Sequence, residues 1–270
     1  MTAHTDADLL AAVEQSPRAA ARRDRSGWVG LFTDDASVED PVGSVPHHGP
    51  EAIGLFFDTF IAPRDITFHP HADIVCGSTV IRDVTLEVRM GPGVSIDVAA
   101  ILRYALEDVG GELRIRELQA FWELPPMLWR FARRGVPAVP VALGLSRAML
   151  VNQRPRGVAG FLTGLHRPAR RRRGEVDTLL AALTGGDQLA GRRILGAGSR
   201  VTEGDDGEPI GIDALGARLM GARVASRITA GFTTAVSLRG PDGPAVLLID
   251  TDPWTVRLFT AGADAGQSRA

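Results

Sequence analysis

Residues 36–44, Ala-Ser-Val-Glu-Asp-Pro-Val-Gly-Ser, place two adjacent carboxylates where a short β-like run meets a turn. Pro41 has a fixed φ angle and keeps the preceding Asp40 extended, so this carboxylate is held in one direction. Gly43 permits the sharp turn that follows. Because apolar segments lie on both sides, we expect Asp40 at the mouth of a hydrophobic pocket, where it would act as a proton-transfer base. The same residues are also compatible with a solvated acidic turn at a strand end.

Residues 31–44, Leu-Phe-x-Asp-Asp-Ala-x-Val-Glu-Asp-Pro-Val-Gly-Ser, are followed by Gly-Pro-Glu-Ala-Ile at 49–53 and by Phe56 and Phe57. This pattern resembles the bacterial ketosteroid isomerases, which belong to the NTF2-like, or SnoaL-like, superfamily. The resemblance covers about residues 6–124. It implies a cone of curved antiparallel sheet wrapped over helices, with one deep apolar pocket. It also implies that Asp40 removes a proton next to a ketone and returns it two carbons away.

The resemblance also implies that most polar partners of this base are missing. The oxyanion-hole tyrosine of the family falls on Ser16, and its protonated aspartic acid falls on Ala100. The two supporting tyrosines fall on Phe32 and Phe57, while the pocket aromatic falls on Trp122. We therefore expect an apolar substrate pocket in which Ser16 is the one polar catalytic candidate besides the base.

Asp97 and Tyr104 are the nearest replacements for the missing donors. Asp97 is three residues from Ala100 and therefore points to the opposite face of the strand, unless a bulge intervenes. Tyr104 has the same parity as Ala100, but its position predicts a strand-end aromatic side chain near solvent.

Asp65 suggests a different reaction class. Tandem NTF2-like chains of about this length occur among the epoxide hydrolases and cyclases of polyether biosynthesis, which use paired acidic residues. By this resemblance, Asp40 and Asp65 would serve as general base and general acid on an epoxide, without an oxyanion hole. A further alternative is a catalytically silent domain that binds an apolar ligand or assembles with a partner.

No metal and no cofactor is expected. His47 and His48 stand close to the acidic turn, but no third ligand follows at motif spacing, which predicts a solvent-exposed loop. His69, His71 and Asp73 alternate along one strand, which is typical of an ordinary polar sheet face.

Helices and strands that would position these residues follow from capping signals and periodicity. Thr5 and Asp8 form a capping box for a first helix, which Pro17 is expected to interrupt. Ser26 is expected to cap a short second helix, and residues 49–50 begin a third with proline in its first turn. Turn residues then separate strands at about 65–76, 79–90, 94–106 and 112–122. The predicted fold class is α+β.

Charge is segregated along the chain. Residues 1–124 hold 20 acids and 10 arginines, residues 125–174 hold 11 arginines and no acid, and residues 175–270 hold 12 acids and 9 arginines. The middle segment is thus a basic connector, and we expect short helices in it at 127–134, 141–151 and 158–165. Its uncharged runs are too short to span a bilayer.

The basic connector has three interpretations. In the first, its arginines are neutralised by docking on the acidic segments beside it, which the nearly balanced net charge of −2 favours. Residues 127–173 would alternatively contact an anionic membrane surface through amphipathic helices. Binding of nucleic acid is not expected, because the aromatic interleaving typical of RNA recognition is lacking.

The pattern of the first segment returns after Glu175. The spacing from Asp187 to Glu203 equals that from Asp24 to Asp40, and strands are expected at about 222–228, 230–239, 245–250 and 254–260. Residues 204–207, Gly-Asp-Asp-Gly, have the composition of a solvated acidic turn. The sequence therefore predicts two tandem NTF2-like domains, at 1–124 and, degenerate, at 175–270, joined by a helical basic linker at 125–174. Such domains commonly pair through their sheets, giving either an internal pseudo-dimer or a homodimer.

The single cysteine, Cys76, allows no intrachain disulfide and is expected to be an inert buried thiol. Residues 1–8 are polar and lack the apolar run of a secretion signal. Both features are consistent with a cytoplasmic protein.

Overall fold

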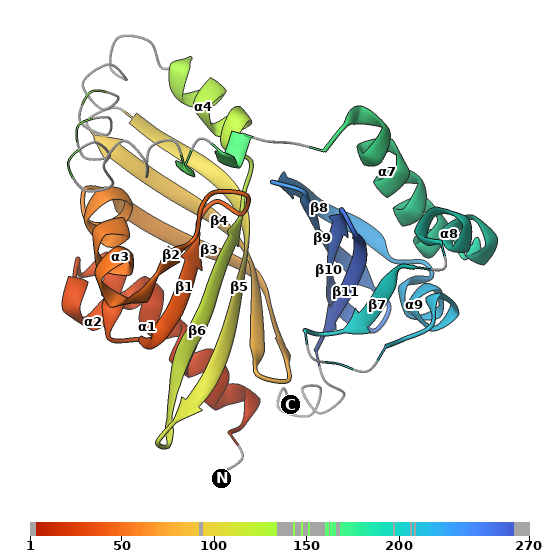
Figure 1. Ribbon diagram of the computed structural model, residues 1–270, viewed down its shortest axis with the longest axis horizontal. Helices are drawn as coiled ribbons and strands as arrows, with labels where there is room; N and C mark the ends of the chain where they lie inside the picture. The colour runs from red at the N-terminus through yellow and green to blue at the C-terminus, as the bar shows by residue number, and fades with distance from the viewer. Residues whose placement is uncertain are drawn as a thin grey trace.

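The structure is a computed structural model that describes residues 4–91, 94–133, 168–196, 198–205 and 209–261, together with residues 143, 147, 151, 160, 161, 163–165 and 207. Two curved sheets face each other in the centre of the molecule, and helices cover the outer side of each sheet (Figure 1). The α+β class predicted from the sequence is confirmed.

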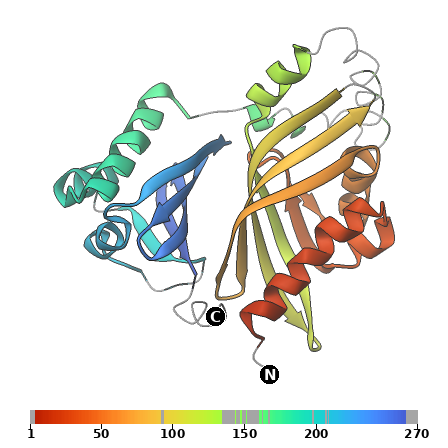
Figure 2. The ribbon, with the colours of Figure 1, turned by 180° about the vertical axis from the view of Figure 1, so that it is seen from behind.

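The N-terminal sheet has the strand order β2-β1-β6-β5-β4-β3, and it is antiparallel except where β1 runs parallel to β6. Its strands are β1 (Phe32–Glu39), β2 (His47–His48), β3 (Asp65–Cys76), β4 (Thr79–Gly91), β5 (Val94–Val109) and β6 (Glu112–Phe121). The helices on its outer side are α1 (Asp6–Ala21), α2 (Arg25–Val29) and α3 (Gly49–Phe56), which continues into the π-helical turn η1 (Phe57–Ile61). Seen from behind, α1 lies across the strands β3 and β4 (Figure 2).

Capping explains where these helices begin. Thr5 accepts a hydrogen bond from the backbone N–H of Asp8, and the predicted capping box is present. The predicted interruption at Pro17 is wrong, because α1 continues through it to Ala21 while its apolar face packs into the core. The cap of α2 is Asp24 rather than Ser26, since the Asp24 carboxylate accepts the N–H of Gly27.

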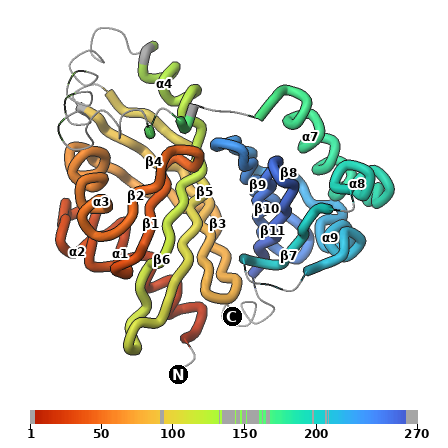
Figure 3. The backbone as a smooth tube through the Cα atoms, in the orientation of Figure 1, coloured from red at the N-terminus to blue at the C-terminus, as the bar shows by residue number. Residues whose placement is uncertain are grey.

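The C-terminal sheet has the strand order β7-β11-β10-β9-β8 (Figure 3). Its strands are β7 (Arg200–Glu203), β8 (Arg223–Ala230), β9 (Thr233–Gly240), β10 (Gly243–Thr251) and β11 (Trp254–Thr260), with helices α7 (Arg170–Gly185), α8 (Gln188–Leu195) and α9 (Ile212–Leu219) outside it. As β1 does with β6, β7 runs parallel to the last strand, β11. Each end of the eight strands expected from the sequence lies within three residues of its predicted position.

A buried apolar layer joins the two sheets, and it is separate from the core on the helical side of each sheet. It consists of Val42, Ile74, Ile81, Ile101 and Phe121 from the N-terminal part and Ile228, Ala230, Ala235, Val246, Leu248 and Phe259 from the C-terminal part. Cys76 packs at this layer and is half-buried, and burial raises the pKa of its thiol. The backbone at Gly43 touches the backbone at Gly231 so closely that a Cβ on Gly231 would lie 2.7 Å from the Gly43 Cα atom.

The connector begins with α4 (Leu124–Ala132), close to the expected 127–134 helix, and η3 (Thr163–Leu165) lies near its end. The helices expected at 141–151 and 158–165 fall largely outside the described residues. Arg130 of α4 donates to the Asp97 carbonyl oxygen at 2.9 Å. Further on, Arg171 and Arg172 pair with Glu175 on their own helix, α7. None of the helices in the described parts of the chain is long and apolar enough to cross a membrane.

Candidate functional site

Asp40 lies at the end of β1, where the chain turns into a pocket of the N-terminal domain. The Trp122 indole Nε1 donates a hydrogen bond to the Asp40 Oδ1 atom at 2.5 Å. The Asp40–Pro41 peptide bond is cis. The indole ring therefore holds the Asp40 carboxylate in place.

Backbone and side-chain hydrogen bonds hold this turn. Glu39 accepts the N–H of Gly43 at 2.8 Å through Oε1, and its Oε2 accepts from the Gln119 amide at 2.8 Å. The Val42 N–H donates to the Ala120 carbonyl of β6 at 2.9 Å. Glu39 is thus a structural carboxylate, which leaves Asp40 as the one that faces the pocket.

Burial controls the charge state of Asp40. Removal from water raises the pKa of this carboxyl to about 6, although the hydrogen bond from Trp122 acts in the opposite direction. A base of this strength is ionised at neutral pH and still binds a proton readily. The expectation of a solvated acidic turn at Asp40 therefore does not hold.

The pocket around Asp40 is almost entirely apolar and has a free volume of about 120 Å³. Drug-sized ligands occupy pockets of about 300 Å³ or more, so a larger ligand requires some lining side chains to shift. The connector contributes Met127 and Phe161 to the lining. The lining residues are Asp40, Phe56, Phe60, Arg64, Ile66, Leu86, Val88, Met90, Val98, Trp122, Met127 and Phe161.

Only part of the predicted pocket wall lines this space. Trp122 does, as expected from the resemblance. Phe32, Phe57 and Ala100 instead lie in the buried core of the domain, where the two phenylalanines pack on the ring of Trp28 at centroid distances of 4.7 and 5.4 Å. They support the pocket from behind and do not line it.

Ser16 is occupied by a structural contact. Its hydroxyl accepts a hydrogen bond from the Trp28 Nε1 atom at 3.1 Å, and both residues are buried. Ser16 is not among the residues that line the pocket. The expected role as a remaining oxyanion donor therefore has no support in its position.

Tyr104 differs from its prediction. It is 1% exposed rather than near solvent, because β5 continues past it to Val109 and the side chain points into the core. Burial raises the pKa of Tyr104 to about 12, and the negative charge of Asp40 acts in the same direction. The phenol is therefore protonated, but it too is not among the pocket-lining residues.

The structure does not bring Asp65 to Asp40. Asp65 lies at the exposed start of β3 and binds Arg23 Nη2 at 2.7 Å. Asp97 is exposed, on the strand face opposite Ala100, as strand parity predicts.

The histidines have ordinary contacts. His47 is half-buried in β2 rather than in a solvent-exposed loop, and its ring contacts Phe56 at 5.2 Å. Burial lowers the pKa of His47. His71 bonds to Thr85 at 2.8 Å. Within the described residues, no group of three or more His, Cys, Asp or Glu side chains is arranged to hold a metal ion.

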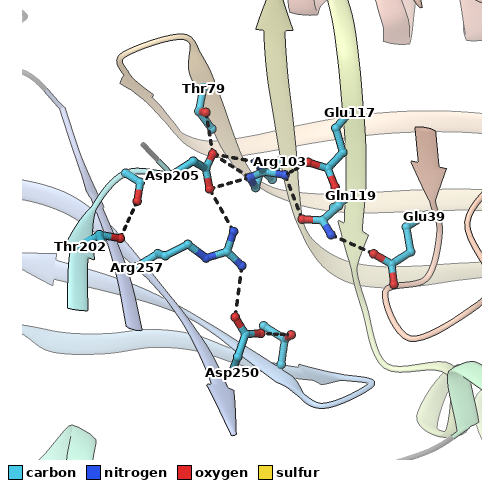
Figure 4. Close-up of polar contacts among 11 residues, drawn as sticks. Glu39, Thr79, Arg103, Glu117, Gln119, Thr202, Asp205, Asp250 and Arg257 are labelled. Carbon is cyan, nitrogen blue, oxygen red and sulfur yellow. Dashed lines mark hydrogen bonds and ion pairs between the residues drawn. The ribbon is translucent and has the colours of Figure 1, made fainter. Parts of the chain in front are cut away.

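A polar network crosses from the second sheet towards the Asp40 turn (Figure 4). Asp205 lies at its centre and binds Arg103 at 2.8 Å and Arg257 at 3.0 Å. Burial acts to raise the pKa of Asp205, but the charges of Arg103 and Arg257 and the hydrogen bonds from Arg103 and Thr79 together outweigh it and hold the pKa below its usual value. The prediction of a solvated turn here is wrong for Asp205, because its segment packs against the first sheet; Asp206 lies outside the described residues.

Sequence reasoning missed two residues of the site. Arg64 lines the pocket, but a single arginine after a helix has no motif that would mark it. Phe161 stacks on Phe60 at 5.2 Å, and only the fold brings the connector back over the pocket.

Comparison with known proteins shows that the model of the SnoaL-like domain family matches residues 13–111, from within α1 to just beyond β5. Among solved structures, the protein RV0760c of Mycobacterium tuberculosis is 26% identical, with a TM-score of 0.41 over 46% of this chain and 96% of that protein. A ketosteroid isomerase of Mycobacterium sp. is 27% identical, with a TM-score of 0.40 over 44% of this chain and 95% of the isomerase. The epoxide hydrolase/cyclase-like enzyme SalBIII is 21% identical, with a TM-score of 0.40 over 44% of this chain and 94% of the enzyme.

Proposed function

We propose that the region of residues 13–111, which the SnoaL-like domain model matches, binds a steroid-like or polyketide-like ketone and that Asp40 is the base that moves a proton next to the ketone. One observation carries the proposal. The Asp40 carboxylate lines a pocket that is otherwise largely apolar, and burial raises its pKa to about 6. Such a carboxylate combines ionisation at neutral pH with useful basicity.

The proton transfer follows from this placement. Ionised Asp40 removes a proton from the carbon next to the carbonyl, and the electron pair of the broken C–H bond forms an enolate. The resulting carboxylic acid then returns the proton two carbons away, which converts a β,γ-unsaturated ketone into the conjugated α,β-unsaturated ketone. Trp122 keeps the carboxylate aimed while the proton is transferred.

Slow turnover is part of the proposal. The positions that would carry the oxyanion donors hold Ala100, which is apolar, and Ser16, which contacts Trp28 outside the pocket lining. Loss of one such donor typically costs about 10²–10³ in rate. A domain that binds the ketone without converting it is therefore the second candidate, and the same observation favours it.

The epoxide alternative requires a second acid beside Asp40. Asp65 is exposed and paired with Arg23, so its position gives that mechanism no support.

The experiment compares the full-length protein with Asp40→Asn. We expect an aromatic steroid such as equilenin to bind both proteins with a dissociation constant at or below the micromolar range, measured by ligand fluorescence. We expect the wild type to convert a β,γ-unsaturated steroid ketone and to exchange its α-protons in D₂O, and Asp40→Asn to do neither.

Asp65→Asn is the matched control, since it makes the same change outside the pocket and should retain full activity. Binding without conversion or exchange in the wild type would leave only the silent ligand-binding candidate. Absence of binding would reject both candidates, and loss of turnover in Asp65→Asn would restore the two-acid mechanism.

We also propose that residues 175–270 are a second, degenerate NTF2-like domain, docked through its sheet as an internal pseudo-dimer partner. The order of helices and strands supports this, because α7-α8-β7-α9-β8-β9-β10-β11 repeats the order of the first domain without a counterpart of β2. Glu203, at the position that echoes Asp40, instead pairs with Arg218 at 2.6 Å.

A further inference from the structure

Arg64 is a buried cation that the proton transfer does not use. It follows η1, lines the same pocket as Asp40, and is 9% exposed. Its guanidinium carbon lies 5.9 Å from the centre of the Phe60 ring, which also lines the pocket. An arginine in such apolar surroundings requires an explanation, since arginine is rarely buried without a partner.

The protein satisfies only part of this guanidinium. The Nη1 atom donates to the carbonyl oxygens of Thr59 at 2.9 Å and Phe60 at 2.6 Å, which ties the side chain to the end of the preceding helix. A guanidinium has five N–H groups. The three on Nε and Nη2 have no hydrogen-bond acceptor among the residues that the structure describes.

The charge of Arg64 is also uncompensated. No described carboxylate lies within ion-pair distance of it, whereas the buried Arg82 and Arg103 each bind two acidic side chains. Burial lowers the pKa of Arg64 to about 10. Removing an unpaired charge from water is costly, so an anion delivered by a ligand would recover much of that free energy.

Arg64 does not fit the role of a replacement oxyanion donor. A donor to the enolate would have to lie beside the atoms that react with Asp40. Among the described residues, no ion pair joins Arg64 to Asp40, and the two enter the pocket from different elements, Asp40 directly after β1 and Arg64 after η1. The two residues therefore contact different parts of one pocket.

We propose that Arg64 binds a carboxylate carried by the apolar ligand, at a distance from the group that reacts with Asp40. The Nε and Nη2 edge of a guanidinium forms two parallel hydrogen bonds with a planar carboxylate. The ligand class is then an apolar ring system that bears a ketone or alkene and an acidic side chain. This inference rests on the proposed function, because it specifies the ligand of the same pocket.

The test uses one steroid carboxylic acid and its methyl ester, which differ only in the charged group. We expect the wild type to bind the acid at least tenfold more tightly than the ester at neutral pH, because only the acid can accept charge-assisted hydrogen bonds from Arg64. In Arg64→Gln this preference should disappear, through weaker binding of the acid with little change for the ester. Arg64→Lys, which keeps the charge but loses the planar fork, should fall between the two.

Arg89→Gln is the control, because Arg89 is an exposed arginine paired with Glu87. This variant should still bind the acid more tightly than the ester. Equal affinities of the wild type for acid and ester would overturn the assignment, and this comparison needs no variant to fold. Arg64→Gln weakening both ligands equally would show a purely structural residue and would also overturn it. If neither ligand binds, the proposed function itself fails, whereas ester binding without an acid preference rejects Arg64 alone.

Discussion

At the scale of single residues, Asp40 and Arg64 are the two ionisable side chains among the residues that line the apolar pocket. The Asp-Pro-Val-Gly-Ser stretch has a recognisable order, and Trp122 follows from the same resemblance. The exposed pairing of Asp65 depends on Arg23, 42 residues away in sequence, which no local pattern contains. Contacts between distant residues decided which polar side chains line the pocket and which ones support it.

The raised pKa of Asp40 predicts a cost in stability. The Asp40 carboxyl binds a proton more tightly in the folded state than in the unfolded state. The free energy of unfolding therefore falls as pH rises from about 4 to about 6, and it stays at the lower value above pH 6. Asp40→Asn should therefore be more stable than the wild type at pH 7, by at most about 3 kcal/mol for a rise of about two pKa units.

Urea unfolding at pH 4 and pH 7 measures this difference. The gain in Asp40→Asn should be present at pH 7 and largely absent at pH 4. If Asp40→Asn and the wild type differ in stability by the same amount at both pH values, burial of the Asp40 charge is not the cause of the difference.

At the scale of elements, periodicity predicted the strands well but not how helix ends and turns are held. Alternation and turn glycines located β3 to β6 within three residues. The continuation of α1 through Pro17 was not predicted, since packing of the helix face overrides the local signal. The close contact of Gly43 with Gly231 joins segments that are almost 190 residues apart, so neither glycine could be interpreted from its own neighbours.

Gly231→Ala tests whether this contact supports the Asp40 turn. Its Cβ atom would lie 2.7 Å from the Gly43 Cα atom, and backbone atoms on both sides cannot simply rotate away. Gly77→Ala is the matched control, because its φ of +60° is close to the +55° of Gly231 but nothing lies within 4 Å of its Cβ position. We expect Gly231→Ala to lose about 1–3 kcal/mol more than Gly77→Ala in chemical unfolding. Equal losses of stability in the two variants would mean that backbone strain alone is responsible, and would refute a supporting contact between Gly231 and Gly43.

At the scale of the whole molecule, the spacing echo predicted a second domain, which stays a prediction, and the face through which the two sheets pack could not be deduced. Along the strands, residues of the apolar layer between the sheets alternate with residues that point into the core on the helical side. In the sequence, the residues of this layer therefore look like ordinary core residues. Asp205 was expected in solvent because glycines and acids surround it, yet it binds the Arg103 side chain, which is 5% exposed. Docking of the sheets thus determines the state of this carboxylate.

Asp205→Asn should destabilise the docked sheets. It removes a counter-charge from both Arg257 and Arg103, while Arg257 keeps Asp250 at 3.4 Å and Arg103 keeps Glu117 at 2.6 Å. We expect a loss on the order of 2–3 kcal/mol, below the roughly 3–5 kcal/mol of a fully broken buried pair.

Asp177→Asn, which removes an exposed pair with Arg227, is the control and should cost less than about 1 kcal/mol. Similar losses in thermal unfolding of the two variants would contradict a central role for Asp205. In the wild type, the contribution of Asp205 should be present above its ordinary pKa of 3.8 and lost as pH falls below it.

The central claim is that Asp40 is a proton-transfer base in an apolar pocket, and one measurement tests it most directly. This is the rate at which the wild type exchanges the α-protons of a bound steroid ketone in D₂O, followed by mass spectrometry as a function of pH. We predict that the rate rises through a single ionisation near the Asp40 pKa of about 6, then levels off, and that Asp40→Asn gives only the uncatalysed rate. Exchange that persists in Asp40→Asn, or a wild-type rate without an ionisation in this range, would contradict the claim.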